Sequence, residues 1–298
     1  MADDWPDQHA CGSMLDCRVY GSVLCRSSVI EMVPMKKRYM TDLDDTEWML
    51  VEPFVRQKPG RGRKRIVATR DVVNALFYLD YTGCQWEMLP KDFPEYHLVN
   101  YYHLKWTRDG TWDAVLDTVR AITRSLEGRT EEPTAAILDS QSVKTTGKGE
   151  ERGFDGGKRI KGRKRFLIVD TLGFLLCIMV MRASRSEPAG GVELLDELQQ
   201  RFPTIRKVWA DSAYSGELVE YVRQWCRFIL EIVRPSPDQR GFQVQPKRWI
   251  VERSISWLNW WRRLSKDYEM TVQSSESMIK IAAIRMMLKR ISQAINVI

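Results

Sequence analysis

The spacing of hydrophobic residues changes near residue 130 of this chain. Before that point, apolar residues recur three and four positions apart, which places them on one side of a helix. After it, short apolar runs alternate with helical stretches, a pattern typical of strands in a sheet covered by helices. We therefore expect a small all-helical region followed by an α/β region with a mixed sheet.

The N-terminal region predicts four helices, and local signals mark their ends. Asp and Thr residues at 41–47 begin the first helix, and Gly83 ends the second. The later helices are expected at 69–81, 96–106 and 112–126. Short helices beside a basic loop are compatible with a helix-turn-helix DNA-binding unit, and a helical packing subdomain explains the same spacing.

The C-terminal region predicts alternating strands and helices after a linker at 130–134. Strands are expected at 135–138, 166–169, 174–180, 207–210 and 228–233, and helices at 191–202, 216–225, 248–264 and 274–298. Residues 1–38 show no sustained period, so we expect a disordered leader or a start codon assigned too far upstream. The predicted domains are therefore residues 39–129 and 130–298.

Positive charge is concentrated in two segments of a chain whose formal net charge is +7. Residues 56–70 hold seven Lys and Arg without an acid, and residues 144–165 hold nine against three acids. The rest of the chain is acidic, so the two segments favour binding to a polyanion such as DNA. Solvated loops also carry such runs.

Cysteine usage and hydropathy limit where the protein works. The six cysteines show no CxxC pair and no metal-ligand spacing, which favours a reducing compartment. Apolar runs stay short of the ~18 residues that a membrane span needs. We expect a cytoplasmic protein without a membrane partner.

Three acidic residues are candidates for chemistry. Asp139 and Asp211 each follow a predicted strand, at the sheet edge where α/β proteins bind ligands. Glu252 lies on the polar side of the helix predicted at 248–264. Three carboxylates suit Mg²⁺ or Mn²⁺, and a pair of such ions supports phosphoryl transfer. Each also has a simpler interpretation, because aspartates close turns and Glu252 can pair with Arg248 on its own helix.

Several motifs resemble one family of enzymes. The motifs are DSQSVKT at 139–145, WADSAYSG at 209–216, RWIVER at 248–253 and RRLSKDYE at 262–269, with LDDTEW at 43–48 and GCQWEMLP at 83–90. Together they resemble the bacterial insertion-sequence transposases of the DDE type, and most closely the insertion-sequence-five group. The resemblance covers about residues 39–290.

This resemblance implies an RNase H-like catalytic domain at 130–298, preceded by a small helix-turn-helix-like DNA-binding domain at 39–129. It implies that Asp139, Asp211 and Glu252 are the catalytic residues and hold two Mg²⁺ or Mn²⁺ ions. The implied enzyme binds the terminal inverted repeats of an insertion sequence, then cleaves double-stranded DNA and transfers the strand. We further expect a homodimer or larger assembly, associated with the bacterial nucleoid.

Two positions depart from the wider superfamily signature Tyr-x2-Arg-x3-Glu-x6-Lys. Arg248 and Glu252 match it, whereas Gln245 and Asn259 replace its Tyr and Lys. The residues predicted to contact DNA are Arg61, Arg63, Lys64, Arg65, Lys144, Lys158, Arg159, Lys161, Arg163, Lys164, Arg248 and Lys266. The segment 147–165 is expected to be mobile until DNA orders it.

Two other functions remain open on the sequence alone. An RNase H-like nuclease would cut DNA without joining strands, and a domesticated relative would bind DNA without catalysis. Three nearby tryptophans have separate predictions: Trp257 and Trp261 are expected in the core, and Trp260 alone is a candidate for stacking on a base.

Overall fold

The helices of the N-terminal region begin and end close to where local sequence signals place them. A computed structural model describes residues 37–57, 65–147, 149–234 and 247–296. Asp44 and Glu47 form a capping box at the first helix, with both backbone–side-chain bonds at 2.8 Å. Gly83, at a φ of 68°, ends the second helix in the left-handed conformation that glycine favours. The helices are α2 (Asp45–Val55), α3 (Thr69–Thr82), η1 (Trp86–Met88), α4 (Tyr96–Arg108) and α5 (Thr111–Leu126).

The sheet has the mixed topology expected of an RNase H-like fold. Its strands are β1 (Ala135–Lys144), β2 (Gly153–Asp155), β3 (Ile160–Asp170), β4 (Leu175–Arg182), β5 (Lys207–Ala210) and β6 (Ile229–Ile232). β2 and β4 both pair with β3, and β3 pairs with β1, all antiparallel. β1 then pairs with β5, and β5 with β6, in parallel. An antiparallel meander continued by parallel strands confirms the predicted fold class.

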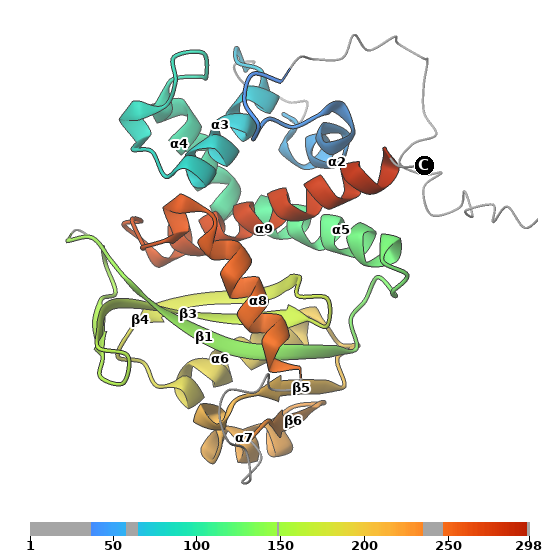
Figure 1. Cartoon of the computed structure of the whole chain (residues 1–298), viewed down its shortest axis with the longest axis vertical. Helices are drawn as coiled ribbons and strands as arrows, with labels where there is room; N and C mark the ends of the chain where they lie inside the picture. The colour runs from blue at the N-terminus through green and yellow to red at the C-terminus, as the bar shows by residue number, and fades with distance from the viewer. Residues whose placement is uncertain (1–36, 58–64, 148, 235–246, 297–298) are drawn as a thin grey trace, which may run out of the picture. The chain divides into compact units, whose positions relative to one another are not determined.

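Helices cover both faces of this sheet (Figure 1). On one face, α6 (Glu187–Arg201) and α7 (Glu217–Trp225) bury a core that includes Ala136 and Leu138 of β1. On the other, α8 (Arg248–Asn259) packs on Ile137, whose side chain points the opposite way because strand residues alternate. The last helix, α9 (Val272–Ile295), also packs on β4.

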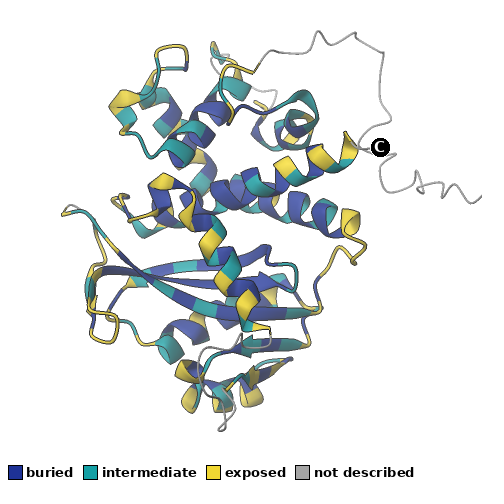
Figure 2. Ribbon diagram, viewed as in Figure 1, coloured by how far each residue is buried: buried dark blue, intermediate teal, exposed yellow. Residues whose placement is uncertain are grey.

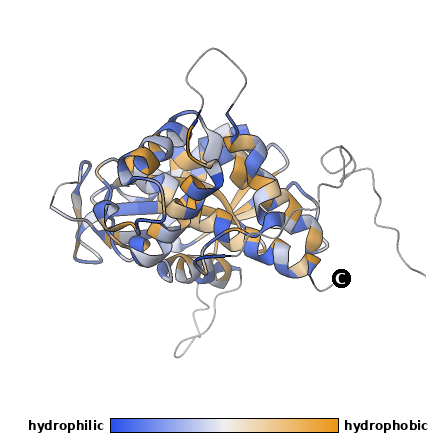
Figure 3. Ribbon diagram, turned by 90° about the horizontal axis from the view of Figure 1, so that it is seen from above, coloured by the Kyte–Doolittle hydropathy of each residue, from blue (hydrophilic) through white to orange (hydrophobic). Residues whose placement is uncertain are grey.

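The N-terminal helices and the sheet share one hydrophobic core. α9 contacts α5, α3 and α2 as well as β4, and its buried side chains join those of Leu76 and Val119 to those of Leu175. Figure 2 shows α9 buried along most of its length, and Figure 3 shows hydrophobic and hydrophilic patches alternating along the helices. The predicted domain boundary at residue 130 stays a prediction, and most of the predicted leader lies outside the described residues.

Two predicted boundaries and one segment predicted to be mobile differ from the structure. β1 continues past Asp139 to Lys144 because β3 pairs with it along that whole stretch. The segment expected to be mobile at 147–165 contains β2 and the first half of β3. The helix expected to reach 264 ends at Asn259, after which Trp261 packs edge-on against Tyr81 of α3, with ring centroids 5.5 Å apart.

Most of the remaining elements lie close to their predictions, but the helix expected at 191–202 is α6, which begins four residues earlier at Glu187. The strand expected at 207–210 is β5, and the helix expected at 216–225 is α7. Among the described residues, no helix combines the length and hydropathy needed to cross a bilayer.

Candidate active site at the edge of the sheet

Strand register brings Asp139 and Asp211 together. β1 and β5 run parallel with Ile137 beside Trp209. Two residues further along each segment, on the same face of the sheet, are Asp139 and Asp211. β5 ends at Ala210, and Asp211 is the first residue after it. The prediction that both aspartates follow a strand therefore holds for Asp211 only, since Asp139 lies within β1.

Each aspartate has one oxygen held by the backbone. The amide of Ser140 donates to Oδ1 of Asp139 at 2.7 Å, and the amide of Ala213 donates to Oδ1 of Asp211 at 2.9 Å. Asp211 thus caps the short helix η2 (Ser212–Tyr214), as the simpler interpretation of this residue predicted. These bonds orient both carboxylates and leave the second oxygen, Oδ2, for another partner.

Glu252 reaches the same place from α8. Ile250 and Val251 of this helix are buried against Ile137 and Val169 of the sheet, which anchors α8 over β1. Glu252 lies on the opposite, exposed side, as the helical periodicity predicted, and its side chain is 51% exposed.

A single nitrogen atom lies among the three carboxylates. Nη2 of Arg248 is 3.9 Å from Oδ2 of Asp139, 3.7 Å from Oδ2 of Asp211 and 3.3 Å from Oε1 of Glu252. Any two of these oxygens are therefore less than twice 3.9 Å apart. Three acids from distant parts of the chain, at positions 139, 211 and 252, converge on one cation.

Electrostatics at this site leaves negative charge unbalanced. Burial raises the pKa of Asp139 to about 6, although the Ser140 amide and Arg248 act in the opposite direction. Within the described ranges, no group of three or more Asp, Glu, His or Cys side chains lies close enough together to hold a metal ion without rearrangement. The oxygen donors and the surplus negative charge still fit a hard divalent cation.

Polar residues continue the site along β1 and α8. Nε2 of Gln141 donates to Oδ1 of Asn259 at 3.1 Å, so the residue that replaces the signature lysine pairs with an amide. Nζ of the exposed Lys158 donates to the carbonyl of Ser140, at 3.2 Å. A neutral amide pair and an exposed lysine therefore border the carboxylates.

The residues predicted to contact DNA fall into several groups. Those exposed on the surface are Lys144, Lys158, Arg159, Lys161 and Lys266. Arg65 is half-buried and donates to the carbonyl of Val55 at 2.9 Å, with its guanidinium over the ring of Tyr102. Arg61, Arg63 and Lys64 lie outside the described residues.

Arg163 and Lys164 do not lie on the surface, and we withdraw them as DNA contacts. Arg163 is fully buried, 3.1 Å from Asp267, and donates to the carbonyls of Glu150 and Met270 at 2.7 Å. Lys164 is buried and donates to Glu187 at 2.8 Å. A run of charged residues in the sequence is typical of a surface loop, and here it belongs to the buried strand β3. The acidic residues of the RRLSKDYE motif were the signal that could have revealed the partner of Arg163, which is Asp267.

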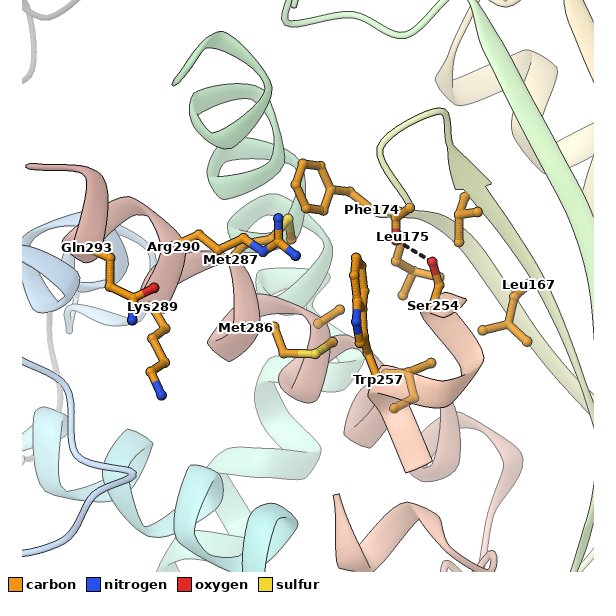
Figure 4. Close-up of a pocket in the computed structure, with 14 residues that line it drawn as sticks. Leu167, Phe174, Leu175, Ser254, Trp257, Met286, Met287, Lys289, Arg290 and Gln293 are labelled. Atoms are coloured by element: carbon orange, nitrogen blue, oxygen red, sulfur yellow. Dashed lines mark hydrogen bonds between the residues drawn. The ribbon is translucent and has the colours of Figure 1, made fainter. Parts of the chain in front are cut away.

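A cavity of about 320 Å³ lies on the far side of α8 from Glu252, between the β3–β4 hairpin and α9. Trp257 forms part of its wall (Figure 4), with the guanidinium groups of Arg253 and Arg290 4.5 Å and 4.9 Å from its ring centroid. Trp257 was expected in the core and is instead half-buried, whereas Trp261 is buried as predicted and Trp260 is 78% exposed.

Comparison with known proteins identifies the family. The family model "Transposase DDE domain" matches residues 130–287, and the model "Putative transposase of IS4/5 family" matches residues 43–116. No curated protein sequence matches the chain. The crystal structure of the Mos1 strand transfer complex is similar over 81% of this chain and 80% of that chain, at 12% identity. The TM-score between the two structures is 0.22.

DDE transposases are enzymes that cut DNA and transfer strands, and the family generally uses divalent metal ions. The DDE model spans more than half of the chain and contains Asp139, Asp211 and Glu252. The chain therefore belongs to the DDE transposases, in their IS4/5 group.

Proposed function

We propose that Asp139, Asp211 and Glu252 are the catalytic carboxylates of this transposase and that they hold two Mg²⁺ or Mn²⁺ ions. The convergence of all three on Nη2 of Arg248 carries this proposal. When bound, the ions activate the attacking oxygen and neutralise charge on the leaving oxygen. Side chains that already surround one cation are suited to hold others.

The three carboxylates differ in how firmly they are placed. Asp139 and Asp211 stand on paired strands, with one oxygen of each bonded to a backbone amide. Glu252 has a longer side chain and greater exposure, so it adapts to its ligand with less cost to the fold. Two preorganised ligands and one adaptable ligand together support a metal site at this edge of the sheet.

The substrate in this proposal is the pair of terminal inverted repeats of the protein's own insertion sequence. Water attacks the phosphodiester at each end, and the freed 3′-hydroxyl then attacks target DNA in line, so that one phosphodiester bond forms as another breaks. The exposed cations Lys144, Lys158, Arg159, Lys161 and Lys266 support phosphate contacts along the duplex. Paired cutting of two ends favours a homodimer or larger assembly in the bacterial cytoplasm.

A cleavage and joining assay tests this function. The substrate is a labelled duplex carrying the inverted repeats that flank the gene, with a supercoiled target plasmid and Mg²⁺. We expect cut 3′ ends that become joined to the plasmid, and loss of both products in Asp139→Asn with binding retained in a gel-shift assay. Asp196→Asn is the matched control, because Asp196 accepts a hydrogen bond from Tyr221 on the opposite face of the sheet.

Three results would contradict the proposal. Cleavage without joining would identify a nuclease, and wild-type cleavage by Asp139→Asn would remove that residue from the active site. Binding without any metal-dependent cleavage by the wild type would identify a non-catalytic DNA-binding protein.

A further inference from the structure

Arg248 occupies an unusual position for a residue of a helix N-terminus. It is the first residue of α8, and no acid accompanies it in the first turn. A cation at this end opposes the helix macrodipole, which favours negative charge there. Its helical neighbour Glu252 follows it by four residues, the less favourable order for an ion pair of this spacing. Local helix stability therefore does not explain why an arginine stands here.

The contacts of Arg248 are also unlike those of a structural arginine. Its three ion pairs measure 3.3–3.9 Å, whereas charge-assisted hydrogen bonds are about 2.7–2.9 Å long. Its side chain is 21% exposed, so it is only partly withdrawn from solvent. One positive charge is shared among three carboxylates, and each of them is only loosely held by it.

We propose that Arg248 is the counter-ion of the three carboxylates in the metal-free protein, and that its displacement couples metal binding to DNA binding. This inference rests on the proposed function. Divalent ions held by Asp139, Asp211 and Glu252 must lie close to the point that Nη2 now occupies, and like charges repel. Because the side chain is long and partly exposed, the displaced guanidinium is free to pair with a DNA phosphate.

Thermodynamic linkage gives this coupling a measurable form. Metal ions release Arg248 for DNA, and DNA draws Arg248 away from the metal ligands, so each ligand tightens the binding of the other by the same factor. Without the arginine, metal ions have no internal competitor. Mn²⁺ should then bind more tightly to the free protein, and DNA should change that affinity less.

Calorimetric titration of the full chain with Mn²⁺ tests the inference, with and without an uncleavable duplex of the element end. We expect Arg248→Gln to bind Mn²⁺ about five- to tenfold more tightly than wild type without DNA, a gain of roughly 1–1.4 kcal/mol. DNA should tighten Mn²⁺ binding several-fold less in this variant than in wild type. Arg248→Lys, which keeps the charge, should stay near wild type.

Lys247→Gln is the matched control. Lys247 is the adjacent residue, and its ammonium lies over the ring of Trp209 at 5.7 Å from the centroid. This substitution removes the same charge from the same end of α8 and should change Mn²⁺ affinity less than twofold. An equal gain in both variants would show a general field effect and overturn the counter-ion role.

The remaining outcomes separate this inference from the proposed function. If wild type and Asp139→Asn bind Mn²⁺ equally, the carboxylates do not hold the metal and both proposals fail. If Asp139→Asn loses Mn²⁺ binding but Arg248→Gln is no tighter than wild type, the active site stands and the coupling fails.

Discussion

Arginines meet carboxylates in two clusters of this protein, and the two clusters are built differently. The open cluster consists of Arg248 with Asp139, Asp211 and Glu252, and its closest ion pair is 3.3 Å long. The closed cluster consists of Arg163, Asp267, Arg263 and Glu269. There, Arg163 and Asp267 are fully buried 3.1 Å apart, and Arg263 pairs with Glu269 at 2.7 Å.

The closed cluster is saturated with partners. Asp267 accepts from Ser275 at 2.7 Å and from the amide of Glu269 at 3.1 Å, while Arg163 donates to several carbonyl groups. The amide of Asp267 also donates to the carbonyl of Lys144 at 2.8 Å, which ties this segment to the end of β1. Buried charges are tolerated because every group is paired.

The open cluster lacks such balance. Three carboxylates share one guanidinium at the sheet edge, so their negative charge exceeds the positive charge that faces it. The number of charges does not separate a binding site from a structural ion pair in this protein. The binding site and the structural ion pair differ instead in the lengths of their contacts and in the number of partners that each charge has.

Replacing one aspartate by asparagine in each cluster should have opposite consequences, and the largest effect on activity is expected in the open cluster. Asp211→Asn should lower the rate of strand cleavage on the order of 10³-fold, about 4 kcal/mol of barrier, because a metal-ligand charge is removed. Its melting temperature should not fall, since removing one of three repelling charges relieves the site. Cleavage kinetics and thermal melting measure both effects. A large loss of stability would place Asp211 among structural residues.

The closed cluster should respond in stability. Asp267→Asn leaves the guanidinium of Arg163 buried without its counter-charge, so the free energy of unfolding should fall by about 3–5 kcal/mol. Urea denaturation measures this loss. Folded Asp267→Asn protein at low temperature should still cleave DNA, and loss of cleavage with unchanged stability would contradict the structural role.

Glu276 offers a carboxylate that belongs to neither cluster. It accepts from the amide of Val180 at 2.8 Å, and burial raises its pKa to about 7, with Glu197 and Asp113 acting in the same direction and Lys280 in the opposite one. Its pKa in the unfolded chain is 4.5, so the folded state binds the proton more tightly and stability falls as pH rises from 4.5 to 7.

Glu276→Gln should remove that part of the pH dependence. The amide oxygen still accepts from Val180 but carries no charge, so the variant should gain on the order of 1–3 kcal/mol over wild type at pH 8. The gain should vanish near pH 4. Denaturation curves at both pH values decide it, and an equal effect at both would point to packing instead of charge.

The smallest expected effect concerns the exposed cations next to the closed cluster. Lys144 and Lys266 lie on either side of the backbone bond between β1 and the Asp267 segment, and both are exposed. Replacing both by Gln should reduce the slope of log affinity against log salt by about 0.9 for each phosphate that the protein no longer neutralises. Arg223→Gln on α7, paired with Glu220, is the control. An unchanged slope would show that neither lysine contacts a DNA phosphate.

Local chemistry accounts for what could be predicted. The capping box of Asp44 and Glu47 and the left-handed Gly83 act within one turn of helix, so their effect is readable from neighbouring residues. The bounds of β5 were indicated by a short apolar run between polar neighbours. The motifs indicated Asp139, Asp211 and Glu252, and the strand register then brought the two aspartates side by side.

The amino-acid sequence alone specified the kinds of elements, most of their ends and the three acids on which the proposed chemistry depends. Folding in three dimensions settled which charges those acids meet. Arg163 and Arg248 were both predicted to contact DNA, yet Arg163 is buried in a strand against Asp267, whereas Arg248 lies among three carboxylates at the sheet edge. Pairing and burial depend on residues that are about a hundred positions away, and no local pattern records them.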